Sequence, residues 1–168
     1  MTPNMTQNTL SPVWACLHTV EDPEIPVVNI VEMGIVRDVA EDGKAVTVTI
    51  TPTYSGCPAM KMIEDNIILA LEQAGFAPVT VKTVIAPAWT TDWMTESARE
   101  SLRQYGIAPP KPTCGATRSP FESPNMHVAC PYCGSAETEL RSRFGSTACK
   151  AIHFCSGCHQ PFESFKCI

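Results

Sequence analysis

Four of the nine cysteines stand in two Cys-x-x-Cys pairs near the end of the chain. The first pair is Cys130-Pro-Tyr-Cys133 and the second is Cys155-Ser-Gly-Cys158, with 21 residues between them. Two such pairs can bring four thiolates to one ion, and this spacing is typical of a zinc ribbon. Four thiolates close a tetrahedral shell, whereas a catalytic zinc keeps an open position. The spacing therefore predicts a structural site for zinc, with iron in a rubredoxin-type site as the alternative.

Two further cysteines and two histidines lie close to these pairs. Cys149 and Cys167 either pack as small apolar residues or form a second thiol pair near the metal, able to hold iron or a cluster transiently. His153 and His159 stand beside predicted ligands, but two complete cysteine pairs already supply a full shell. We therefore expect neither histidine to replace a cysteine.

Another cysteine, Cys57, stands at the expected start of a helix, in Thr53-Tyr54-Ser55-Gly56-Cys57-Pro58. Proline suits the first helical position, so we expect Pro58 there and Cys57 at the N-cap. The helix dipole at that position favours negative charge and therefore thiolate. Thiolate is the form that acts as a nucleophile or binds soft metals. The alternative interpretation is a small buried residue at a tight turn, and the residues alone leave both open.

Two carboxylates, Asp22 and Glu24, lie on a loop stiffened by Pro23 and Pro26. Such a loop could bind a cation. It could equally be the end of a helix followed by solvated acids, since proline stops helices. The residues alone favour the second interpretation.

Composition excludes several classes of protein. The chain has 168 residues, with 12 Lys and Arg against 17 Asp and Glu, and a net charge of −5. That acidity argues against nucleic acid as a partner. No apolar run reaches the roughly 18 residues that a membrane span needs, and the first residues do not resemble a secretory signal. We therefore expect a cytoplasmic protein without a membrane partner. Nine cysteines cannot all pair internally, so metal ligands or reactive thiols are expected among them.

The elements that must position these residues can be read from hydrophobic periodicity. In the first part of the chain the pattern predicts, in order, a helix starting at Ser11 and Pro12, strands over 35–39 and 45–51, a helix over 60–74, a strand over 79–85 and a helix over 95–105. Asp42-Gly43 between the first two strands predicts a hairpin. This order favours an α/β (α+β) fold, a small mixed-sheet sandwich with flanking helices.

Prolines separate this part from the cysteine-rich end. Five of them fall between residues 109 and 124, which predicts an extended linker. We therefore expect an α/β domain over 10–107, a linker over 108–126 and a zinc-ribbon-like module over 127–168. Strands are expected over 139–144 and 151–154, and a third strand carries Phe162 and Phe165.

Two longer stretches carry a family resemblance. The first part of the chain resembles small metal–sulfur assembly proteins, which include iron–sulfur assembly factors, through DPEIPVVNIVEMGIVRDV and TPTYSGCPAMKMIEDNI. Nearly the whole chain resembles the D subunits of the multicomponent phenylacetyl-CoA epoxidases, through APAWTTDWMTESARESLRQYGIAPP, CPYCGS and FGSTACKAIHFCSGCHQPFESFKCI. The resemblance implies phenylacetate catabolism and an accessory role. It makes Asp22 and Glu24 the acidic loop of the assembly family and Cys57 its reactive cysteine.

This resemblance implies a maturation factor that takes up iron or an iron–sulfur cluster transiently at Cys57, aided by Asp22 or Glu24. Its expected partners are the oxygenase subunits or the iron–sulfur reductase of the epoxidase, and a homodimer is a further option. The first alternative is a non-catalytic structural subunit. The second is a thiol enzyme for acyl or thioester chemistry, which would need a general base, and no motif places His18 in that role. We expect no catalytic activity of its own.

Overall fold

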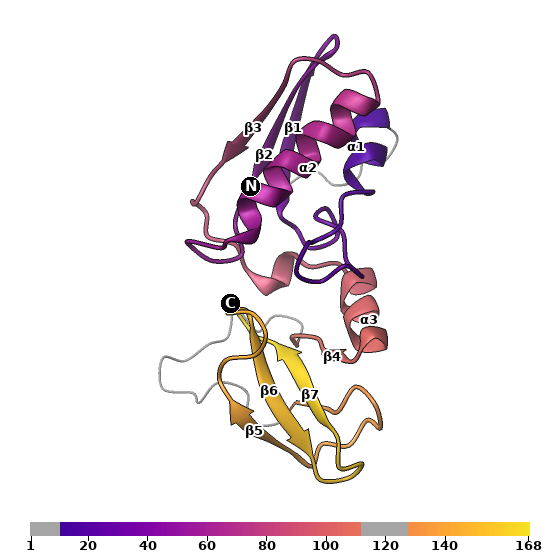
Figure 1. The fold of residues 1–168 in the computed structure, drawn as a ribbon, viewed down its shortest axis with the longest axis vertical. Coiled ribbons are helices and arrows are strands. Elements are labelled where there is room, and N and C mark those ends of the chain that lie inside the picture. The colour runs from indigo at the N-terminus through magenta and orange to yellow at the C-terminus, as the bar shows by residue number, and fades with distance from the viewer. Residues whose placement is uncertain (1–10, 112–127) are drawn as a thin grey trace. The chain divides into compact units, whose positions relative to one another are not determined.

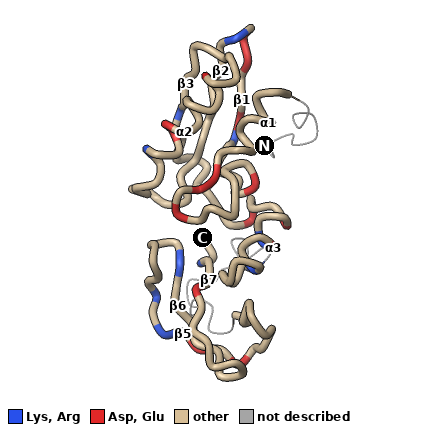
Figure 2. The backbone as a smooth tube through the Cα atoms, turned by 45° about the vertical axis from the view of Figure 1, so that its right-hand side comes forward, with Lys and Arg blue, Asp and Glu red and all other residues tan. Residues whose placement is uncertain are grey.

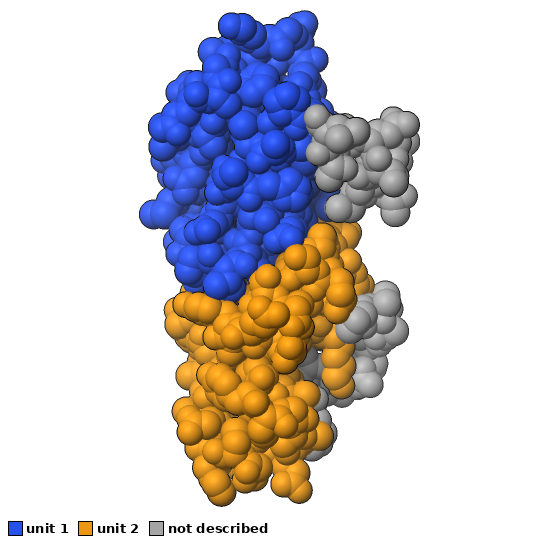
Figure 3. Space-filling view, turned by 90° about the vertical axis from the view of Figure 1, so that its right-hand side faces the viewer, with its two compact units in different colours: residues 1–89 blue, residues 90–168 orange. Residues whose placement is uncertain are grey.

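The computed structural model describes residues 11–111 and 128–168, and the chain divides into two compact units. Unit 1 comprises residues 1–89 and unit 2 comprises residues 90–168, drawn in blue and orange in Figure 3. Each unit has its own sheet, so each is described by itself. In the described part of the chain, none of the helices has both the length and the apolar character that crossing a membrane requires.

Unit 1 is a three-stranded mixed sheet with two helices (Figure 1). Its elements are α1 (Pro12–Leu17), β1 (Val36–Asp42), β2 (Ala45–Ile50), α2 (Ala59–Gln73) and β3 (Val79–Thr83). The central strand β2 pairs antiparallel with β1 and parallel with β3. The parallel pair needs a crossover, which α2 supplies. The predicted element order and the mixed sheet are both confirmed.

Periodicity explains why unit 1 folds this way. Every second residue of β2 is buried, and Gly43 supplies the positive φ of 61° that the hairpin before β2 needs. Along α2, the residues at helical spacing are buried, and this helix lies across one face of the sheet (Figure 1). These two faces form the core, and their buried residues are Val46, Val48, Ile50, Ile63, Ile67 and Leu71.

The helix predicted from Ser11 is shorter than its apolar pattern indicates. The Ser11 hydroxyl accepts a hydrogen bond from the Val13 N–H, as expected of an N-cap. The helix ends at Leu17, because the next backbone bonds tighten to i→i+3 spacing and the Thr19 hydroxyl donates to the Cys16 carbonyl at 2.7 Å. Residues 19–26 therefore form a turn-rich loop instead of more helix.

Unit 2 is a four-stranded sheet preceded by a short 3-10 helix and an α-helix. Its elements are η1 (Thr91–Trp93), α3 (Glu96–Tyr105), β4 (Ile107–Ala108), β5 (Thr138–Ser142), β6 (Lys150–Cys155) and β7 (Pro161–Phe165). The strand order is β4-β7-β6-β5, with β5, β6 and β7 antiparallel and β4 parallel to β7. The three strands predicted for the ribbon are therefore present, and β4 is an addition.

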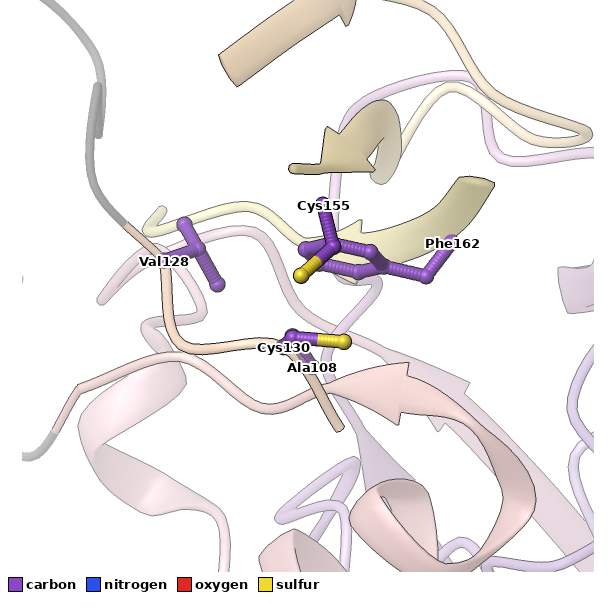
Figure 4. Close-up of a cluster of buried hydrophobic side chains, with 5 residues drawn as sticks. All are labelled: Ala108, Val128, Cys130, Cys155 and Phe162. Carbon is purple, nitrogen blue, oxygen red and sulfur yellow. The ribbon is translucent and has the colours of Figure 1, made fainter. Parts of the chain in front are cut away.

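The predicted domain limits of 107 and 127 differ from the division at residue 90. Ala108 joins the buried cluster of the ribbon (Figure 4), and β4 pairs with β7 through Ala108 and Ser164. Arg99 is buried on α3 and donates to the carbonyls of Thr91 and Pro110. The pairing of Ala108 with Ser164 places β4 in the ribbon sheet, and the two Arg99 bonds tie α3 to the segments on either side of it, so the last predicted helix of the first domain belongs to the second unit. Most of the predicted linker, residues 112–126, lies outside the described residues.

Candidate functional site

The four paired cysteines converge on one point in unit 2. The sulfurs of Cys130, Cys133, Cys155 and Cys158 all lie within 4.8 Å of one another. The Sγ atoms of Cys130 and Cys158 are 3.7 Å apart, and those of Cys133 and Cys155 are 3.6 Å apart. Zinc bonded to four sulfurs at about 2.3 Å would place those sulfurs about 3.8 Å apart in a tetrahedron. The donor set and its spacing therefore fit a closed, structural zinc site.

Each cysteine pair sits in a turn with the same backbone plan. The residue after the second cysteine has a positive φ in both turns, 75° at Gly134 and 58° at His159. Equivalent backbone bonds close the two turns: Cys130 N–H donates to the Ser135 carbonyl at 2.9 Å, and Cys155 N–H donates to the Gln160 carbonyl at 3.0 Å. Histidine is among the residues that tolerate this left-handed conformation. His159 therefore has a structural place in its turn outside the four-sulfur cluster.

The second histidine, His153, lies on strand β6 with its side chain buried. It is 1% exposed and stacks on Phe162, with ring centroids 5.4 Å apart. Burial lowers the pKa of its imidazole, which therefore stays neutral at pH 7. Among the described residues, the cluster of potential ligands contains neither His153 nor His159. The expectation that histidine replaces no cysteine agrees with this geometry.

The surroundings of three of the four cysteine thiols shift their pKa values in different directions. Burial and the nearby sulfurs of Cys133 and Cys130 raise the pKa of the Cys158 thiol to about 12. Burial also opposes ionisation of Cys155, but the backbone N–H of Cys158 and the neighbouring thiols outweigh it and lower the pKa of Cys155 to about 7. At Cys133 a backbone hydrogen bond from Ser135 is outweighed by desolvation and by the Cys155 thiol, so its pKa is raised above 9.0.

Zinc affinity should therefore depend steeply on pH. At pH 8 the metal must displace protons from at least Cys133 and Cys158, so the affinity should rise by at least about a hundredfold per pH unit. Below pH 7 Cys155 is protonated as well, and the slope should steepen by about another factor of ten per pH unit. Competition with a chelator of known proton affinity between pH 6 and 8.5 measures this. A flat profile would contradict these protonation states.

The two additional cysteines lie apart from the cluster. Cys149 is buried just before β6, with its Sγ 3.0 Å from the Thr147 hydroxyl. Cys167 is disulfide-bonded, so it does not offer the thiol expected for a second pair. Of the two interpretations left open for Cys149 and Cys167, a second pair of free thiols would need a thiol that the disulfide-bonded Cys167 does not offer, whereas the burial of Cys149 agrees with a small apolar packing residue.

Cys57 lies in unit 1, one residue earlier relative to the helix than predicted. The N-cap of α2 is Pro58, which already has helical angles, and no side chain caps this end. The Cys57 N–H donates to the Tyr54 carbonyl and its own carbonyl accepts from Met60 N–H, both at 3.3 Å. The thiol is half-buried. Cys57 is therefore a turn residue before the helix and not its cap.

The acidic loop is organised by its own carboxylate. Asp22 is 7% exposed, and its Oδ1 accepts hydrogen bonds from the N–H groups of Glu24 at 2.8 Å and Ile25 at 3.1 Å. This bonding fixes the turn. Asp22 also borders a surface hollow of about 350 Å³ between residues 19–26 and the second half of α2. In the described residues, Asp22, Glu24 and Cys57 do not form a three-ligand cluster.

One surface feature of unit 2 was not found by sequence reasoning. Phe144, after β5, is 70% exposed, and the ammonium of Lys166 lies 4.8 Å from its ring centroid. The signal in the sequence is two arginines directly before a phenylalanine, in Arg141-Ser-Arg143-Phe144. That signal is short, and a sequence does not reveal whether such a phenylalanine is exposed.

Two family models match this chain. The model described as "Iron-sulfur cluster assembly protein" matches residues 11–83, and the model described as "PaaD zinc beta ribbon domain" matches residues 116–166. The two matches fall on either side of the division at residue 90. They assign the mixed sheet with its two helices to the first kind of domain and the four-cysteine sheet to the second.

Similar proteins point the same way. An Escherichia coli protein named as the putative D subunit of 1,2-phenylacetyl-CoA epoxidase is 49% identical over 93% of this chain and 92% of its own length. An "Fe-S protein maturation auxiliary factor" of Porphyromonas gingivalis is 40% identical over 51% of this chain and 83% of its own. A solved Bacillus anthracis structure titled as a domain of unknown function, DUF59, has a TM-score of 0.51 and 31% identity, covering 54% of this chain and 87% of its own.

Proposed function

Because this chain belongs to the family of the 1,2-phenylacetyl-CoA epoxidase D subunits, we propose that it is an accessory factor that assists insertion of iron or an iron–sulfur cluster into a multicomponent epoxidase. The client is the oxygenase or its iron–sulfur reductase. One observation carries the proposal: a domain of the iron–sulfur assembly kind is joined in one chain to a closed four-sulfur module.

The closed module supports an accessory role over a catalytic one. Cys130, Cys133, Cys155 and Cys158 would hold zinc, and four sulfurs leave no coordination position for substrate. Bound zinc supplies folding energy to a sheet with a small apolar core. The chemistry of metal transfer then falls to unit 1, where Cys57 is the candidate thiol. Its half-burial leaves the sulfur partly accessible to an incoming ion.

In this proposal Cys57 binds iron or a cluster transiently, as cargo that is passed on. Glu24 is half-buried and lies on the loop that Asp22 holds in shape. The Asp22 carboxylate therefore acts as a positioning group, because two backbone N–H groups already bond its Oδ1. A thiol nucleophile is the weaker alternative: His18 is exposed at the end of α1, and no side-chain hydrogen bond joins it to Cys57 within the described residues.

The test compares Cys57→Ser with Cys16→Ser, which alters another half-buried cysteine of unit 1. We expect Cys57→Ser to lower the iron content of the client and epoxidase activity in cells by about tenfold or more. Cys16→Ser should leave both unchanged. Metal and sulfide analysis of protein purified without oxygen is the second readout. Equal client iron content in wild type and Cys57→Ser would refute the transfer role and favour a structural subunit.

A further inference from the structure

We propose that unit 2 docks an acidic surface of its epoxidase client through an exposed phenylalanine and the cations near it. The patch comprises Arg141, Arg143, Phe144 and Lys166, and we call it the Phe144 patch. This inference rests on the proposed function for the identity of the client, and it adds where and by what chemistry the two proteins meet.

The first argument is the surroundings of the aromatic ring. Phe144 is 70% exposed, the ammonium of Lys166 lies 4.8 Å from its centroid, and the adjacent Arg143 is exposed. Arg141 lies with its guanidinium 5.1 Å from the centroid of the Phe154 ring. Figure 2 shows Lys and Arg segments along β5 and the loop that follows it. Single exposed apolar residues are ordinary on protein surfaces, but Phe144 lies beside a cation, and aromatic and arginine side chains are enriched at protein interfaces.

The second argument is that the loop bearing Phe144 is held rigidly. The Ser142 hydroxyl donates to the Phe144 carbonyl at 2.8 Å and accepts from its N–H at 3.1 Å. The next residue, Gly145, donates to the Lys150 carbonyl at 2.8 Å. A side chain at Gly145 would meet Glu163 Oε1 at 2.7 Å, so the loop fits closely against the sheet. A rigid display lowers the entropy lost on binding.

Charge selects the occupant. Lys166 lies against the ring, the exposed Arg143 is the neighbour of Phe144 in the chain, and the exposed Arg141 is ion-paired with Glu139 at 2.6 Å. Unit 2 has eight Lys or Arg and seven Asp or Glu, whereas unit 1 has four and ten. A nucleic acid is a poor match, because the net negative charge of the whole chain would repel it and because three cations are few for binding a polyanion. An acidic protein surface with an apolar pocket for the ring matches the patch best.

The experiment measures binding of the full chain to each purified subunit of the epoxidase, at 50 and 300 mM NaCl. We expect binding to one subunit to weaken with salt, and Phe144→Ala to weaken it by about tenfold or more. Arg143→Glu should weaken it and reduce the salt dependence. Tyr105→Ala, an exposed aromatic of the same unit, and Lys82→Glu, an exposed cation of unit 1, are matched controls and should change affinity by less than about twofold.

Several results would overturn the patch. Affinity unchanged in both Phe144→Ala and Arg143→Glu would do so, as would no binding to any subunit. Tighter binding to single-stranded RNA, duplex DNA or vesicles containing phosphatidylserine than to the subunits would assign the patch another ligand. Zinc content and circular dichroism verify that the variants fold. Cys57→Ser reports on metal transfer separately. If docking were unchanged in both patch variants while Cys57→Ser lowered the iron content of the client, the docking patch would be wrong and the proposed function would stand.

Discussion

Cys155→Ser is expected to abolish tight zinc binding and to unfold the sheet of unit 2, while unit 1 stays folded. Cys155 is 0% exposed and lies in the buried cluster with Ala108, Val128, Cys130 and Phe162, shown in Figure 4. This cluster is small, so the sheet depends on the bond between metal and sulfur. Losing a residue outside the ligand shell costs metal sites about 10- to 100-fold in affinity, and losing a ligand should cost more.

Zinc content per chain and a backbone amide NMR spectrum measure this effect. Cys149→Ser is the matched control, because Cys149 is also a buried cysteine of unit 2 but lies apart from the four-sulfur cluster. It should retain one zinc and an unchanged spectrum around the two turns. If Cys155→Ser retained one zinc with wild-type affinity, the four-sulfur shell would be wrong.

Glu163→Ala should destabilise unit 2 by about 2 to 3 kcal/mol. Lys150 is 4% exposed, and its ammonium lies 2.8 Å from Glu163 Oε2. Without that carboxylate a buried cation has no counter-charge, and the Ser146 N–H loses the acceptor that lies 2.6 Å away. The expected loss of stability is smaller than for a fully buried ion pair, because the Glu163 side chain is 28% exposed.

Urea unfolding at pH 7 with zinc in excess measures the loss. Glu139→Ala is the matched control: it removes a carboxylate from an ion pair whose side chains are both 55% exposed, and should cost less than about 0.5 kcal/mol. A double-mutant cycle with Lys150→Met and Glu163→Gln isolates the coupling between the two side chains. Equal losses in Glu163→Ala and Glu139→Ala would contradict the importance of burial.

The same pair gives the sign of a pH dependence. Burial disfavours the charged form of Glu163, but hydrogen bonds from Lys150 and Ser146 outweigh it and lower its pKa below 4.5. A lowered folded-state pKa stabilises the fold above the unfolded value, and this contribution is lost as the pH falls through the folded one. The stability difference between wild type and Glu163→Gln should therefore shrink below about pH 4.5.

Local patterns accounted for most of the elements. Alternation of Val46, Val48 and Ile50 predicted a strand with one buried face, and the structure has that strand. Asp42-Gly43 predicted a hairpin, and Gly43 has the positive φ that this turn needs. Thr95 is the N-cap of α3 and Gly106 is its C-cap. Such signals lie within a few residues of the element that they specify, so they can be read without knowing the fold.

The boundary between the units could not be read in this way. β4 has two residues, and its partner β7 is more than 50 residues away. A strand of two residues has no periodicity to detect, and the prolines that follow it are typical of a linker. The same limit applies to Cys57. A shift of one residue in the start of α2 decides whether Cys57 is the helix cap or a residue of the preceding turn, and element boundaries are the least certain part of any pattern.

By itself the sequence determined the kinds of chemistry available to this protein: four thiols at metal-ligand spacing, a thiol at the start of a helix, and an acidic loop. Spacing along the chain limits these possibilities, because a Cys-x-x-Cys turn brings its two sulfurs together in any fold that accommodates it. Only the tertiary structure decided that the two cysteine pairs meet within 4.8 Å, that Asp22 bonds its own loop, that Cys167 is oxidised and that Phe144 is exposed. Each of these depends on contacts between segments or on burial, which arise only when the chain packs.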